Sequence, residues 1–182
     1  MSIMKLSKPV SIDDPYREIV LVFLHDYFDT LVWELRNHFG IELNSKDMPG
    51  SEDDYLSLLI AESIADMVRV ASGDTKGLDR AEIYEHVQGL VEKLFGIPGE
   101  SSYDIPDKFW KSDFGSIVMA AFVWSQGDKL ITISDAADLS GKSVKSISQY
   151  VARGKLQSYP DMSEPNPQKR VRVLKSEAKA LR

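Results

Sequence analysis

The sequence contains no cysteine among its 182 residues. The chain therefore has no disulfide, no thiol nucleophile and no cysteine-ligated zinc site, and nothing points to an oxidising compartment. Long apolar runs are also missing. The two longest, Ile19–Leu24 and Ile117–Trp124, fall short of the roughly 18 residues that identify a membrane-spanning helix. The first residues do not resemble a secretory signal, so we expect a cytoplasmic protein with no membrane partner.

Catalytic motifs are missing as well. The sequence has no glycine-rich phosphate loop, nucleophile elbow or zinc-protease motif. Its histidines, His25, His38 and His86, stand near carboxylates, but the Glu-x-x-His pairs of a di-iron bundle do not occur. Surface carboxylates of an acidic domain explain these groups better than a metal site does. We expect no enzyme activity, no catalytic residue, no metal and no cofactor.

Charge divides the chain into two parts. Residues 129–182 carry eleven Lys or Arg and five Asp or Glu, a net charge of +6. Residues 1–128 carry eleven basic and twenty-three acidic side chains, a net charge of −12. A basic segment attracts phosphates and an acidic one repels them. We therefore predict an acidic domain over 1–127, for assembly or interaction, and a basic domain over 128–182.

Four helices are predicted in the acidic domain: the first three because apolar side chains recur every three or four residues, and the fourth, whose period is ambiguous, because its Ala, Met and Gly content and the stop at Gly127 favour a helix over a strand. Their expected spans are 15–39, 52–71, 79–95 and about 117–124, with Asp13 or Asp14 as the cap of the first helix and Gly40 at its end. The first helix has a broad apolar surface, which suits a bundle or a subunit interface. The predicted fold class is mainly α, with a bundle of about four helices in front of the basic domain.

The basic domain has a different layout. Ser134 is expected to cap a short helix that ends at Gly141, and Ser143 a second helix that runs to about Arg153. A strand over 156–159, a proline-containing loop and an alternating strand over 170–173 follow. The order of helix, turn, helix and two-stranded wing predicts a small winged helix-turn-helix.

The second helix of this domain is the predicted recognition helix. Ile147 and Val151 face the core, so the opposite surface would meet the bases in the major groove. Gln can pair with adenine, Lys with guanine, and Ser with either base. The wing, about 156–174, would place its basic side chains on the phosphate backbone. The predicted DNA-binding residues are Ser143, Val144, Lys145, Ser148, Gln149, Arg153, Lys155, Lys169, Arg170 and Arg172.

Three strings in this region carry a resemblance to a known family: 131–141 (ITISDAADLSG), 143–147 (SVKSI) and 151–156 (VARGKL). Together they resemble the winged helix-turn-helix of the excisionase/MerR-like DNA-binding superfamily. Lys142 departs from the family pattern, which usually has a small apolar residue there. The resemblance covers about 130–182 and implies DNA binding in transcriptional control or in phage and plasmid recombination.

Three functions remain open at this point. The favoured one is a sequence-specific transcriptional regulator that binds double-stranded DNA as a homodimer through its N-terminal helices, because one module reads few base pairs. The second is an antitoxin or adaptor whose N-terminal helices bind a partner protein, with the DNA module for autoregulation. The third is an excisionase-like architectural factor.

Overall fold

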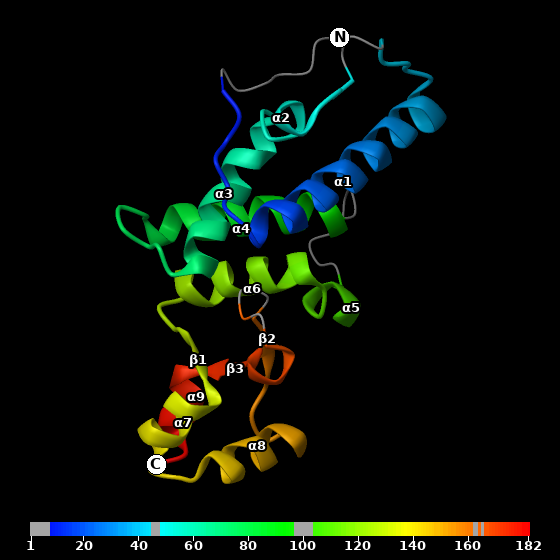
Figure 1. Ribbon diagram of the computed structural model, residues 1–182. Coiled ribbons are helices and arrows are strands. Elements are labelled where there is room, and N and C mark those ends of the chain that lie inside the picture. Colours follow the sequence, from blue (N-terminus) through cyan, green and yellow to red (C-terminus); the bar gives the residue numbers. More distant parts are fainter. Residues whose placement is uncertain (1–7, 45–47, 97–103, 162–163, 165) are drawn as a thin grey trace. The chain divides into compact units, whose positions relative to one another are not determined.

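The computed structural model describes residues 8–44, 48–96, 104–161, 164 and 166–182. It divides into two compact units, Met1–Val68 and Arg69–Arg182. Within the described residues the fold is mainly helical, with nine α-helices and one small three-stranded antiparallel sheet (Figure 1). The prediction of a mainly α protein is therefore confirmed.

The first unit begins with the long helix α1, Tyr16–Phe39. Its buried side chains, Tyr16, Val20, Leu24 and Phe28, are spaced by four residues and therefore lie on one face. Gly40 ends the helix, as predicted, in a left-handed conformation with φ at 64°. The predicted caps at Asp13 and Asp14 are wrong. The N-cap position is Pro15, and the backbone carbonyl of Asp13 accepts the first helical N–H groups instead.

The single helix predicted over 52–71 is in fact two helices. Helix α2 spans Glu52–Tyr55 and helix α3 spans Leu59–Ser72. Leu56 and Leu58 lie in the break, and both are buried. In a continuous helix, side chains two positions apart point about 200° away from each other. Both leucines therefore reach the core only because the helix is interrupted.

Helices α4, Arg80–Phe95, and α6, Asp113–Ser125, pack against each other in the second unit. Asp79 caps α4 by accepting hydrogen bonds from two backbone N–H groups, which confirms the predicted start. The apolar run over 117–124 is helical and largely buried, also as predicted. A short helix, α5 (Asp107–Trp110), was not predicted; of the loop expected over 97–107, residues 97–103 lie outside the described residues. Gly115 is needed where α5 meets α6, because a Cβ there would lie 1.8 Å from the Phe109 carbonyl oxygen.

The C-terminal segment contains the sheet. Its elements are, in order, β1 (Leu130–Thr132), α7 (Ile133–Ser140), α8 (Val144–Ala152), β2 (Tyr159–Pro160), a 3-10 turn η2 (Pro167–Lys169), β3 (Val171–Leu174) and α9 (Lys175–Ala180). The strand order is β1-β3-β2, with Thr132 and Tyr159 both opposite Arg172. Strands β2 and β3 pair in antiparallel fashion, but β2 lies at 159–160 instead of the expected 156–159, and the predicted two strands are part of a three-stranded sheet. Strand β1 and helix α9 were not predicted.

One hydrophobic core joins these C-terminal elements. Ile147 of α8 is fully buried, as predicted, and Val151 and Tyr150 pack at its edge. The buried members are Ile131, Ala136, Ala137, Ile147, Leu156, Val173 and Ala178. Both β1 and β2 also contact α6. The predicted boundary at 127–128 therefore falls inside the second compact unit, and independent folding of 128–182 stays a prediction.

Candidate nucleic-acid interface

Helix α7 begins two residues earlier than a cap at Ser134 would place it. Its N-cap is Thr132, whose hydroxyl oxygen accepts a hydrogen bond from the Asp135 N–H at 3.0 Å. The Asp135 carboxylate in turn accepts from the Thr132 N–H at 3.3 Å, so the two residues form a capping box. The predicted cap at Ser134 is wrong: Ser134 is an exposed residue of the first turn.

A three-residue turn joins α7 to α8. Gly141 has φ at 69°, a left-handed conformation that glycine adopts without a steric penalty. The Lys142 N–H then donates to the Ala137 carbonyl at 3.1 Å, which closes the turn. The Ser143 hydroxyl accepts from the Ser146 N–H at 3.1 Å and begins α8, as the sequence predicted. These local contacts define the angle at which α8 leaves α7.

The outward face of α8 is polar. Ile147 points into the core, so Lys145 and Gln149, two positions before and after it, point away at about 200° around the helix. Both side chains are exposed, as is Arg153 at the C-terminal end of the helix. The structure thus presents long hydrogen-bonding side chains along one outer surface of α8.

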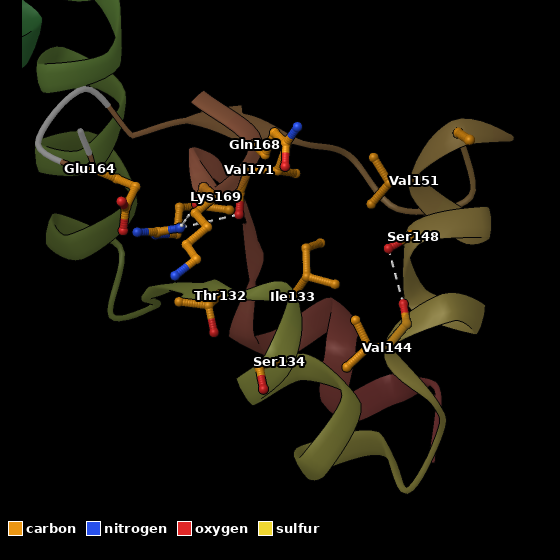
Figure 2. Close-up of a pocket in the computed structure, with 12 residues that line it drawn as sticks. Thr132, Ile133, Ser134, Val144, Ser148, Val151, Glu164, Gln168, Lys169 and Val171 are labelled. Atoms are coloured by element: carbon orange, nitrogen blue, oxygen red, sulfur yellow. Dashed lines mark hydrogen bonds between the residues drawn. The ribbon is translucent and has the colours of Figure 1, made fainter. Parts of the chain in front are cut away.

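A second flank of α8 is formed by Val144 and Ser148. The Val144 side chain is 50% exposed. The Ser148 hydroxyl donates to the Val144 carbonyl at 3.0 Å (Figure 2), so it keeps only its acceptor capacity for another molecule. Lys155, beyond the end of the helix, holds its Nζ 5.8 Å from the centre of the Tyr150 ring. A cation at this distance from a ring is stabilised by the ring's electron density.

In the hairpin, residues 159–174, two arginines that were predicted to contact DNA are bonded to other groups of the protein instead. The Arg172 Nη2 lies 2.5 Å from the Asp161 carboxylate, and only 14% and 21% of the two side chains are exposed. Its Nη1 donates to the Lys169 carbonyl at 2.5 Å. The Arg170 Nε donates to the Glu164 carbonyl at 2.8 Å. Both guanidinium groups therefore shape the hairpin, and Lys169 is the basic side chain that it leaves exposed.

A groove of about 600 Å³ separates α8 from the hairpin. Figure 2 shows that Val144 and Val151 extend from α8 toward the space that Ile133 of α7 also borders. Its ionic side chains are Glu164, Lys169 and Arg172, and the last is already paired with Asp161, so no strong charge of one sign accumulates there. The groove is lined by Thr132, Ile133, Ser134, Val144, Ser148, Val151, Ala152, Glu164, Gln168, Lys169, Val171 and Arg172.

The groove brings together four predicted residues, Val144, Ser148, Lys169 and Arg172. It also contains residues that the sequence reasoning missed, among them Ile133, Gln168 and Val171. The alternation of the last strand was the available signal for Val171. Nothing in the local sequence marked Ile133 or Gln168, because they border the groove only after the sheet has formed.

Burial and nearby carboxylates affect one tyrosine of this region. Burial, together with the charges of Glu177 and Asp128, raises the pKa of the Tyr159 phenol above its usual value. Tyr159 is therefore a neutral side chain at physiological pH, and it places no negative charge on the hairpin.

The histidines do not assemble a metal site in the described parts of the chain. His25 lies 3.4 Å from the Asp29 carboxylate and its ring contacts Tyr55. No group of three or more metal-ligating side chains was found among the described residues.

The chain was compared with protein-family models, with curated proteins and with solved structures, and none of them matches it. Within the described residues, no helix combines the length and the apolar character needed to cross a bilayer.

Proposed function

We propose that this chain is a sequence-specific DNA-binding protein and acts as a transcriptional regulator. In this proposal β1 to α9 form a winged helix-turn-helix, α8 enters the major groove, and the hairpin lies along the phosphate backbone. The observation that carries the proposal is the outward face of α8. It presents Lys145 and Gln149 immediately after a tight helix-helix turn, while Ile147 anchors the helix in the core.

The chemistry of that face fits base edges. A lysine ammonium donates to guanine O6 and N7, and a glutamine amide both donates and accepts at adenine. Ser143 lies at the N-terminus of α8, where backbone N–H groups and the helix dipole favour a phosphate. Arg153 at the end of α8 and Lys169 on the hairpin supply further exposed positive charge. Arg170 and Arg172 support the DNA surface by holding the hairpin rather than by offering free guanidinium groups.

A homodimer would carry two copies of this module and could therefore bind two half-sites on the DNA. Helix α1 exposes apolar side chains that a monomer would leave in water, notably Trp33 at 57% and Phe39 at 71%. We place the subunit interface there. Sedimentation of the full chain should give twice the monomer mass of 20.5 kDa, and Trp33→Ala should shift the population toward the monomer. A full-length protein that stays monomeric at micromolar concentration would rule out the dimer.

The test of DNA binding is selection from random duplexes by the full-length protein at moderate salt. We expect one enriched motif, with two copies about ten base pairs apart if the protein is a dimer. Affinity should fall steeply as salt rises, because phosphate contacts release counterions. The matched control is Lys145→Ala with Gln149→Ala, two exposed changes that leave the core intact. Binding without any enriched motif, or no difference between the control and the native chain, would refute the proposal.

The exposed face of α1 also favours a second candidate function. Trp and Phe are frequent anchors of protein interfaces, so the N-terminal unit could bind a partner protein as an antitoxin or adaptor does. A stable complex with one other protein that forms without DNA, and that Trp33→Ala abolishes, would support this function over the dimer.

A further inference from the structure

Val144 is an apolar side chain on a polar recognition surface. It lies in the first turn of α8, half of its surface is exposed, and it borders the groove beside the hairpin. Its neighbours on the outer face of the helix are polar, and half of its surface is in contact with water in the free protein. Contact with an apolar group of a ligand would remove that surface from water and stabilise the complex.

Ser148 stands one helical turn further on the same flank. Residues four apart on a helix lie about 5–6 Å from each other. The hydroxyl hydrogen of Ser148 is used by the Val144 carbonyl, so the oxygen can accept a hydrogen bond but has no hydrogen left to donate. The flank therefore offers a ligand an apolar contact and, next to it, a hydrogen-bond acceptor.

Base edges in the major groove offer few partners for such a flank. The thymine methyl group is the apolar group among the four standard bases, and the amino groups of adenine and cytosine are the hydrogen-bond donors. A single T·A pair presents both a methyl group and an amino group on one edge. We infer that Val144 and Ser148 together read one T·A base pair, with Val144 against the thymine methyl group and Ser148 accepting from the adenine amino group.

This inference rests on the proposed DNA-binding function and makes it more specific. It assigns a base pair to the flank of α8 that faces the hairpin, whereas Lys145 and Gln149 remain the readers on the outer face. It also explains why a valine occupies an exposed position at the end of the helix that enters the groove first.

The first experiment removes one methyl group at a time. The duplex selected by full-length protein is resynthesised with uracil in place of each thymine in turn, and the Kd of each duplex is measured. At one position uracil should weaken binding by the native chain about fourfold, the effect of one buried methyl group. Val144→Ala should weaken binding to the thymine duplex by a similar factor and should make the protein indifferent to uracil at that position.

In the second experiment, the adenine that pairs with this thymine is replaced by unsubstituted purine, which lacks the amino group. The native chain should lose about fivefold in affinity, the effect of one neutral hydrogen bond, and Ser148→Ala should not distinguish adenine from purine. Circular dichroism melting controls for folding, and both changes lie on exposed side chains.

The outcomes separate the two proposals. If no duplex is enriched, the DNA-binding proposal itself fails. If a duplex is enriched but no uracil changes the Kd, or Val144→Ala still responds to uracil, the T·A assignment alone is wrong. The assignment is also wrong if Val144→Ala and Ser148→Ala lose their response to base changes at two different base pairs.

Discussion

Individual side chains of the C-terminal segment separate into those that face outward and those that hold the structure. Lys145 and Gln149 are exposed on the outer face of α8, where a change of side chain leaves the core unaffected. Arg172 is of the other kind, because its guanidinium group is paired with Asp161 and with a backbone carbonyl. The same positive charge therefore has different consequences at different positions.

Gln149→Ala should reduce the discrimination between the selected duplex and random DNA by about 1–3 kcal/mol, because a bidentate base contact is lost. Lys169→Ala is the comparison. Loss of an exposed lysine that contacts the phosphate backbone of DNA should weaken binding to all sequences alike. Titration of both duplexes with each variant measures the difference. Equal loss on both duplexes for Gln149→Ala would show that this residue does not read a base.

Arg172→Ala should lower the free energy of unfolding by about 2 kcal/mol, because a charged hydrogen bond is lost and the Asp161 carboxylate remains in a poorly hydrated place. Urea denaturation measures this value. Lys169→Ala, on the same hairpin but exposed, should change stability by less than about 0.5 kcal/mol. If Arg172→Ala were as stable as the native protein, the ion pair would contribute little to the hairpin.

At the scale of elements, two joins determine how α7, α8 and the sheet are arranged. The capping box of Thr132 and Asp135 begins α7 directly after β1, and the Gly141 turn directs α8. Each join satisfies backbone groups at a helix end that would otherwise lack partners. The orientation of the proposed recognition helix thus depends on a few hydrogen bonds at the helix ends.

Thr132→Ala should cost about 1 kcal/mol of stability, because the N-cap hydrogen bond to Asp135 is removed. Ser134→Ala is the matched control: it changes a hydroxyl two residues away, at an exposed site in the first turn, and should be nearly neutral. Thermal or urea unfolding of the two variants compares them. A larger effect at Ser134 would mean that the cap is at the position expected from the sequence.

At the scale of the whole molecule, charge is the dominant contrast. The first unit, residues 1–68, holds five basic and thirteen acidic side chains, a net charge of −8. The second, residues 69–182, holds seventeen basic and fifteen acidic ones, a net charge of +2. An acidic unit on the same chain opposes the approach of a polyanion at low salt, where charges act over longer distances.

Neutralising three exposed acids of α1, through Asp26→Asn, Asp29→Asn and Glu34→Gln, should therefore strengthen binding to random duplex DNA. We expect an increase of about two- to threefold near 20 mM salt, which disappears near 200 mM as screening shortens the range of the charges. Replacing the uncharged Thr30 and Asn37 of the same helix by Ala controls for changes in the helix. An unchanged affinity at both salt concentrations would show that the first unit does not influence DNA binding electrostatically.

The sequence by itself determined the elements whose signals are local. Helices α1 and α4 lie where the spacing of apolar side chains placed them, and Gly40, Asp79 and Ser143 mark helix ends as expected. Composition, rather than spacing, indicated α6. The burial of Ile147, and with it the outward direction of Gln149, also followed from helical periodicity. These features depend on residues within one or two turns of each other.

Only the tertiary structure decided the features that join distant residues. The break between α2 and α3 exists because two nearby leucines both reach the core. Helix α9 begins where the Asp128 carboxylate accepts hydrogen bonds from the N–H and hydroxyl groups of Ser176, 48 residues along the chain. Strand β1 is recognisable only through its pairing with β3. Such contacts leave no periodic pattern in the sequence, because each partner gains its role only when folding brings the other beside it.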